Sequence, residues 1–286
     1  MTAFDPRITA ARPDLAAERW RGIIPADRYA GGILMQVVTG TAPLFGAARS
    51  DGPMQSELLF GETLTCYERS DDGWCWGQMT GDDYVGYVPS DMLAPVASQP
   101  TRRIGSLRSF VYPGPSIKSA PVMALSFGAQ LVITAEKDGF SSLAQGGFVV
   151  SRHLVDIDHC ADDPAAQALM MLGAPYLWGG RSSLGMDCSG LVQLALQACA
   201  IACPRDSDQQ ERALGSPVGQ DSDLQRNDLV FWKGHVGIML DADILLHANG
   251  HHMACIAEPL AEARARILAK TGHDISAVKR LDPLPE

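Results

Sequence analysis

Alternating apolar and polar positions dominate the first half of the chain. Between residues 33 and 95, short runs with hydrophobic residues at about every second position are separated by turns rich in Asp, Gly and Ser. Two such runs are Glu62 to Tyr67 and Tyr84 to Val88. A period of two places successive side chains on opposite faces of a strand. The pattern therefore predicts a small all-β barrel or sandwich.

Residues 101 to 157 repeat this pattern with the same landmarks. The turn Asp72-Gly73-Trp74 returns as Asp138-Gly139-Phe140, and the ending Ser90 to Leu93 returns as Ser151 to Leu154. The offsets between the two copies vary only from 61 to 67 residues. Such self-similarity indicates a tandem duplication.

The last part of the chain has the pattern of an α+β domain. Asp162 and Asp163 cap a predicted helix at 165–172, and the apolar run at 191–201 predicts a buried one. Further elements are predicted as a polar loop at 202–210, strands at 228–233, 235–240 and 244–248, a helix at 258–271 and a strand at 276–281. The predicted segments are an N-terminal arm at 1–32 that packs on a neighbour, β modules at 33–97 and 98–160, and an α+β domain at 161–286.

Composition and charge narrow the function classes. The 286 residues are 46% hydrophobic and 20% charged, as in globular proteins, and the net charge is -10. This charge argues against nucleic acid or an anionic membrane surface as the main partner. The seven cysteines are irregularly spaced and include no CxxC pair, so we expect no zinc and no cofactor. Neither a signal segment nor a membrane span is recognisable, so we expect a cytoplasmic protein and a monomer.

A cysteine with catalytic potential stands where a glycine-rich stretch meets the apolar run. Cys188 lies between Asp187 and Ser189, at the predicted first turn of a buried helix. The partial positive charge of a helix N-terminus favours the thiolate, which is the nucleophilic form. The alternative is that Cys188 simply fills the core, as most free cysteines do.

Two histidines on neighbouring predicted strands supply a candidate base. A hairpin turn centred on Asp241 sets His235 directly opposite His247. Both share a strand face with Gly237, which leaves room for the helix of Cys188 to approach. One imidazole can then take the thiol proton while the other orients it. Asn249 is a second candidate for the orienting role.

The successive motifs resemble those of NlpC/P60 cysteine peptidases. The residues that carry the resemblance are Tyr176-x-Trp178-Gly179-Gly180, Asp187-Cys188-Ser189-Gly190, Pro204-Arg205-x-Ser207-x-x-Gln210, Asn227-Asp228, His235-Val236-Gly237 and His247-Ala248. The two β modules resemble bacterial SH3-like (SH3b) domains, although the second lacks the tryptophan of the first. The resemblance implies two SH3-like barrels and a papain-like α+β domain, with Cys188 as nucleophile, His235 as base and His247 as orienter.

The resemblance also implies a substrate. Relatives with two modules are γ-D-glutamyl-L-diamino acid endopeptidases, so short murein peptides of the form L-Ala-γ-D-Glu-diamino acid are the expected partners. The implied substrate-binding residues are Asp187 and Ser189 around the free α-amine of L-Ala, Tyr84 and Glu62 from the first module, Ser207, and Tyr176 and Trp178 at the cleft.

Each of these residues also has an ordinary structural interpretation. Asp187 is suited to a helix N-cap. Tyr84 is suited to a barrel core and Glu62 to a solvated turn. Tyr176 and Trp178 are suited to packing. Alternatives for the whole protein are an amidase or acyltransferase of the same superfamily, or a non-catalytic wall-binding SH3b protein.

Overall fold

The computed structural model describes residues 4–219 and 223–282. It divides the chain into two compact units that meet between Ile157 and Asp158. The first unit is built almost entirely of strands, and the described part of the second combines a six-stranded sheet and the two-stranded sheet of β18 (Arg181–Ser182) and β19 (Gly185–Met186) with four helices. Among the described residues, no helix has the length and apolar character that crossing a membrane requires.

The first module of the first unit is a sheet of seven antiparallel strands in the order β5-β4-β8-β7-β6-β3-β9. In chain order these are β3 (Ile33–Val37), β4 (Thr41–Phe45), β5 (Met54–Leu59), β6 (Thr63–Arg69), β7 (Trp74–Met79), β8 (Val85–Pro89) and β9 (Leu93–Pro95). Alternate residues of these strands, including Leu44, Leu64 and Val88, form a closed apolar core. The predicted period-two pattern is therefore confirmed for this sheet.

The N-terminal arm packs on this same sheet. It contains the parallel pair β1 (Leu15–Ala17) and β2 (Arg28–Ala30), joined through a short 3-10 helix. Leu15 and Ala17 bury against Trp76 of β7, and the guanidinium carbon of Arg12 lies 4.4 Å from the Trp76 ring centroid. The sequence predicts that the arm packs on a neighbour but does not say which one. That neighbour is the outer face of the first module.

A disulfide joins Cys66 on β6 to Cys75 on β7, inside the core of the first module. The sequence analysis assigned these two residues no partner. They are nine residues apart along the chain, on adjacent antiparallel strands. The other five cysteines are free thiols.

The rest of the first unit contains three small antiparallel sheets around a second apolar core. Their strands are β10 (Arg102–Ile104), β11 (Arg108–Val111), β12 (Met123–Ser126), β13 (Gln130–Leu131), β14 (Ile133–Lys137), β15 (Phe140–Leu143), β16 (Phe148–Val150) and β17 (Leu154–Asp156). Phe60 from the first module is buried in this second core. Its carbonyl oxygen accepts the backbone N–H of Gln130 at 2.8 Å, so the two β regions are joined by packing as well as by the chain.

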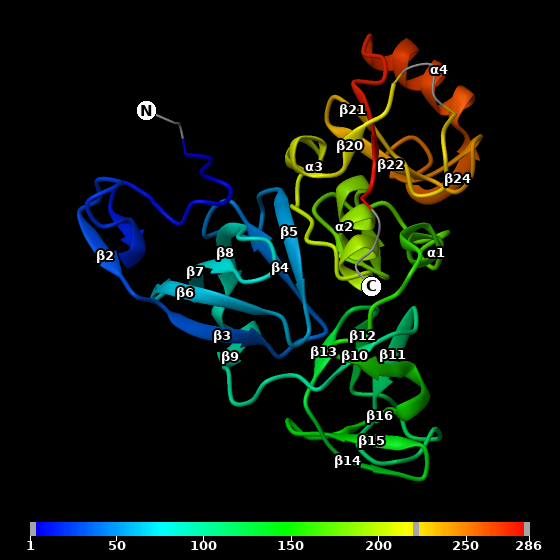
Figure 1. The fold of residues 1–286 in the computed structure, drawn as a ribbon. Coiled ribbons are helices and arrows are strands. Elements are labelled where there is room, and N and C mark those ends of the chain that lie inside the picture. Colours follow the sequence, from blue (N-terminus) through cyan, green and yellow to red (C-terminus); the bar gives the residue numbers. More distant parts are fainter. Residues whose placement is uncertain (1–3, 220–222, 283–286) are drawn as a thin grey trace. The chain divides into compact units, whose positions relative to one another are not determined.

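The second unit has a six-stranded antiparallel sheet in the order β20-β25-β21-β22-β23-β24. These strands are β20 (Ser216–Pro217), β21 (Leu229–Trp232), β22 (His235–Met239), β23 (Ile244–Asn249), β24 (Ala254–Pro259) and β25 (Ala277–Arg280). Helix α2 (Cys188–Ala198) packs against β22 and β23. Helix α4 (Leu260–Thr271) lies on the other side of the sheet, where Ala263 packs on Met239 and Leu245 (Figure 1).

Several element boundaries differ from the prediction, three of them near the site. Helix α1 (Pro164–Leu169) ends three residues early, and the predicted polar loop contains helix α3 (Ser207–Ala213). The predicted terminal helix begins at Leu260, because the residues before it form strand β24. This last difference moves Glu258 from a helix start into the sheet.

Candidate active site

Cys188 is the first residue of α2 and follows a tightly packed loop. Its preceding residue, Asp187, caps the helix: Oδ1 accepts the backbone N–H of Gly190 at 2.7 Å, and Oδ2 accepts that of Gly179 at 2.9 Å. A Cβ added at Gly190 would collide with the carbonyl oxygen of Gly180. Only glycine allows the loop and the helix start to approach this closely.

The Cys188 thiol is buried, with 8% of the residue exposed. Burial, followed by the negative charge of Asp187, raises the pKa of this thiol to about 12. Backbone N–H groups of Val236 and Ser189 and the cation of Arg205 act in the opposite direction. Desolvation of the charged form thus outweighs the donors at the helix start, which favour the thiolate.

The two strand histidines meet in a register that differs from the predicted one. Ile238 pairs with Leu246, two residues away from the expected alignment, so Gly237 rather than His235 stands opposite His247. A shift of two residues keeps every side chain on its face of the sheet. The rings therefore still meet diagonally, with Nε2 of His235 2.7 Å from Nδ1 of His247.

Gly237 makes room for the histidine pair and not for the helix. A Cβ at this position would collide with Leu245 and would lie 3.1 Å from the Cβ of His247. The thiol of Cys188 instead lies against the backbone N–H of Val236, the residue that follows His235. The Cys188 thiol thus reaches the start of β22, at the residue next to the proposed base.

Both imidazoles are neutral around neutral pH. Burial, with the neighbouring His247 adding to it, lowers the pKa of His235 to about 3. Burial also lowers the pKa of His247, although the hydrogen bond that it donates to Glu258 opposes this shift. A neutral imidazole has a free lone pair, so His235 can accept the thiol proton at the moment of attack.

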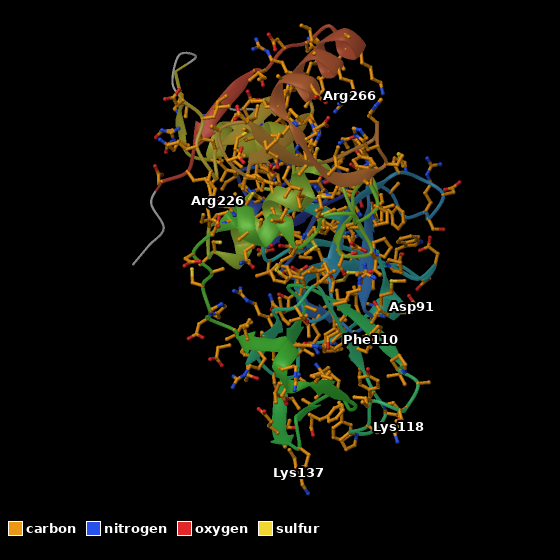
Figure 2. All side chains as sticks on the ribbon, turned by 90° about the vertical axis from the view of Figure 1, so that its right-hand side faces the viewer. Asp91, Phe110, Lys118, Lys137, Arg226 and Arg266 are labelled. Carbon is orange, nitrogen blue, oxygen red and sulfur yellow. A yellow bond between two sulfur atoms is a disulfide. The ribbon has the colours of Figure 1, made fainter. Side chains whose placement is uncertain are left out.

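Two residues that the sequence pattern did not indicate extend this chain of contacts. Oε1 of Glu258, on β24, lies 2.7 Å from Nε2 of His247. Nη1 of Arg266, on α4, lies 2.7 Å from Oε2 of Glu258 (Figure 2 labels Arg266 on this helix). Among the contributions to the Glu258 pKa, burial is largest and raises it, but Arg266 and His247 together hold it at about 2. The carboxylate is therefore ionised.

Arg205 is a third residue that received no role from the sequence. It is 1% exposed, and its two terminal nitrogens bind the Asp187 carboxylate at 2.9 and 2.7 Å. Nη1 also lies 2.9 Å from the Ser189 hydroxyl. The helix-cap interpretation of Asp187 is thus confirmed, and its charge is already balanced by a buried cation.

The remaining predicted residues of this unit differ in their surroundings. Burial raises the pKa of Tyr176 to about 12, and the nearby Cys188 and Asp187 add to this shift, so its phenol is protonated. Trp178 is 64% exposed. Ser207 is the first residue of α3.

Tyr84 and Glu62 belong to the first unit. Tyr84 is 2% exposed and packs in the core of the first module. Oε2 of Glu62 accepts the backbone N–H of Leu59 at 2.9 Å. Their contribution to substrate binding stays a prediction.

Comparisons with known proteins find relatives of both parts of the chain. Residues 173–265 match the NlpC/P60 family, and residues 44–93 match the bacterial dipeptidyl-peptidase Sh3 domain. The chain is 27% identical to dipeptidyl-peptidase 6 of Lysinibacillus sphaericus, over 74% of this chain and 86% of that one. It is 29% identical to the gamma-D-glutamyl-L-lysine dipeptidyl-peptidase of Bacillus subtilis, over 70% and 73% of the two chains.

A solved structure shares the fold. The crystal structure of an NlpC/P60 family protein from Bacillus cereus superposes with a TM-score of 0.72 at 21% identity. The match covers 88% of this chain and 100% of the other.

Proposed function

Because this chain carries an NlpC/P60 cysteine peptidase domain behind a bacterial SH3 domain, we propose that it cleaves the γ-D-glutamyl-L-diamino acid bond of short murein peptides with a free N-terminal L-Ala. The observation that carries the proposal is the contact between His235 and His247, at 2.7 Å, beside the strand residue that touches the Cys188 thiol. A buried thiol with an oriented neutral base beside it is suited to acyl transfer through a covalent intermediate.

The proposed reaction starts from a neutral thiol. Sγ of Cys188 attacks the γ-carbonyl carbon of D-glutamate while its proton passes to Nδ1 of His235, the ring nitrogen that His247 does not engage. The tetrahedral oxyanion forms close to the phenol of Tyr176, which is protonated and can donate to it.

Breakdown of the intermediate returns the proton. The C–N bond breaks, and the diamino acid leaves as an amine that takes the proton from His235, leaving a thioester on Cys188. His235 then removes a proton from water, which attacks the thioester. The products are L-Ala-γ-D-Glu and the restored thiol, so atoms and protons balance.

We propose that the free amine of L-Ala is held by Asp187 and Ser189, with Ser207, and by Tyr84 and Glu62 of the first module. Arg205 already balances the Asp187 carboxylate, so Asp187 by itself brings no net negative charge to the amine. Trp178, which is 64% exposed, is proposed to wall the cleft.

The second β region, 98–160, is proposed to be another SH3-like module. It has its own apolar core, which includes Ile104, Leu131 and Val149. Like the first, it is built from short antiparallel strands around a tight Asp-Gly turn. Its proposed part is to shape the protein and not to hold a ligand.

We further propose action in the cytoplasm, on peptides released by cell-wall turnover, as a monomer. The disulfide between Cys66 and Cys75 is the observation that opposes this location, because disulfides are rare in reducing compartments. Thiol mapping of protein quenched in intact cells decides the question: a reduced pair supports the cytoplasm, and an oxidised pair points to export.

The experiment for the function uses a tripeptide, L-Ala-γ-D-Glu-L-diamino acid, and its N-acetylated form. The expected products are L-Ala-γ-D-Glu and the free diamino acid, from the unblocked peptide alone. Cys188→Ala should abolish cleavage, while Cys160→Ala, at an exposed free thiol, should not change it. Cleavage by Cys188→Ala would refute the mechanism, and equal cleavage of both peptides would refute the amine-binding site alone.

A further inference from the structure

Four side chains from four elements form one chain of polar contacts that ends at the proposed base. From β22, Nε2 of His235 meets Nδ1 of His247 on β23 at 2.7 Å. Nε2 of His247 meets Oε1 of Glu258 on β24 at 2.7 Å. Glu258 is in turn held by both terminal nitrogens of Arg266 on α4. The two inner members, His247 and Glu258, are 0% and 8% exposed.

The chemistry of these contacts fixes where the protons are. An ionised carboxylate only accepts, so Nε2 of His247 must carry a proton and donate it to Glu258. Nδ1 of His247 is then the acceptor, and it must receive the proton on Nε2 of His235. His235 is left with a free lone pair on Nδ1, as a base for Cys188 requires.

Asn249 competes for the same nitrogen of His247. Its Nδ2 lies 3.0 Å from Nε2, and its Oδ1 is held by the backbone N–H groups of His251 and His252. If Asn249 donated a hydrogen bond to Nε2 of His247, that nitrogen would carry no proton. Nε2 and the Glu258 carboxylate would then be two acceptors facing each other. The ion pair with Arg266 keeps Glu258 ionised and so decides against that arrangement.

We propose that Glu258, held by Arg266, is a positioning residue of the reaction: it fixes the tautomer of His247 and thereby makes Nδ1 of His235 the base. This rests on the proposed function of Cys188 and His235. When the thiol proton moves to His235, the negative charge of Glu258 also stabilises the new imidazolium through His247. Arg266 holds the carboxylate in place across the sheet edge.

The test measures how fast iodoacetamide alkylates Cys188 at each pH, read at that residue by peptide mass spectrometry. In Glu258→Gln the side chain keeps its size and loses its charge. Because proton transfer to His235 becomes harder, alkylation around pH 7 should fall about 10-fold. The difference from the unmodified protein should narrow as the pH rises towards the raised pKa of the thiol, where hydroxide takes the proton directly.

The titratable and charged groups around His247 are His235, Glu258, Arg266 and His252. The pH profile of alkylation is therefore compared with that of matched variants that leave all four of these residues intact. Glu262→Gln and Arg264→Gln make the same chemical changes on exposed positions of α4 and should match the unmodified protein. Arg266→Gln should give a smaller loss than Glu258→Gln, with the same narrowing at high pH.

The peptidase assay supplies a second readout. Glu258→Gln should lower kcat by about 10- to 100-fold while KM changes little, since the residue does not touch substrate. A loss that is equal at every pH, or no loss, would overturn the proposal. If Glu258→Gln does not fold, Arg266→Gln decides: a profile identical to that of Arg264→Gln would overturn it. Activity in Cys188→Ala would refute the proposed function separately.

Discussion

Gly237 faces His247 across β22 and β23, so closely that a Cβ on Gly237 would lie 3.1 Å from the Cβ of His247. The same added carbon would lie 2.7 Å from Cδ1 of Leu245, which is buried in the core under α4. The backbone of β22 can therefore approach its neighbour only where no side chain intervenes. The position of the His247 ring depends on this gap.

Gly237→Ala should displace His247 and weaken the second unit. Overpacking of this kind costs about 1–3 kcal/mol, and the moved imidazole should reduce kcat more than it changes KM. Chemical denaturation and peptidase kinetics measure the two effects. Gly250→Ala is the matched control, because its added carbon meets only the Tyr176 ring edge at 3.9 Å. Equal behaviour of the two variants would contradict the prediction.

Arg205→Met should destabilise the second unit strongly. It removes the buried partner of Asp187 and leaves that carboxylate uncompensated, a change that costs about 3–5 kcal/mol. Arg212→Met makes the same substitution in an exposed pair with Asp208 on α3, where the expected cost is within about 0.5 kcal/mol. Urea denaturation of both variants checks the difference, and similar midpoints would show that the Arg205 network is not structural.

Acid should unfold the second unit through its buried histidines. The folded pKa of His235 is about 3 and that of His247 is also lowered, whereas unfolded histidines titrate at about 6.5. Between these values only the unfolded chain binds the protons, so stability is full above pH ~6.5 and falls as pH drops towards 3. The expected slope is about 1.4 kcal/mol per pH unit for each histidine, over a pH window that depends on how far its pKa is lowered.

Denaturation midpoints from pH 7.5 to pH 4 measure this slope. His247→Gln should flatten it, while His273→Gln, at an exposed position after α4, should leave it unchanged. Because His235 contributes as well, part of the slope should remain; an undiminished slope in His247→Gln would mean that other groups control acid unfolding. Glu258, whose pKa is about 2, adds a separate loss that begins only below its unfolded value of about 4.5.

Reduction should affect the two units differently. Opening the disulfide between Cys66 and Cys75 removes a short cross-link and should lower the stability of the first module by about 2–3 kcal/mol. The same reductant keeps Cys188 active. Thermal unfolding with and without dithiothreitol, followed together with peptidase activity, separates these effects. Unchanged unfolding of the first module would contradict the prediction, with Cys66→Ser as the permanent reduced form for comparison.

The contact between His235 and His247 could be predicted from the sequence even though the predicted strand register was wrong by two residues. A shift of two residues leaves each side chain on the same face of its strand. The turn is centred on Ala242 and not on Asp241, since Leu240 donates to the carbonyl of Ile244. An Asp241 side chain that caps the N–H groups of Asp243 and Ile244 sets this geometry, and no periodic pattern reports it. A register error of one residue would have separated the rings.

Glu258 and Arg205 could not be assigned for a different reason. Glu258 stands directly before Pro259 and Leu260, where a helix begins, so its place in β24 is hidden by the helical pattern that follows. Arg205 binds a carboxylate that precedes it by 18 residues, and burial of an arginine has no signature in periodicity. The only signal was an arginine inside a recognised motif. The state of the Cys188 thiol depended on how deeply the folded chain buries it.

The buried, protonated thiol of Cys188 has a consequence for survival of the enzyme between turnovers. Peroxide and other electrophiles attack the thiolate form of cysteine. At Cys188 both the fraction of thiolate and the exposed area of the residue are small. Inactivation by oxidative stress should therefore be slow for the idle protein and should concentrate on exposed Cys160 instead. Covalent inhibitors of this site would have to bind like a substrate first, because reactivity alone will not direct them to it.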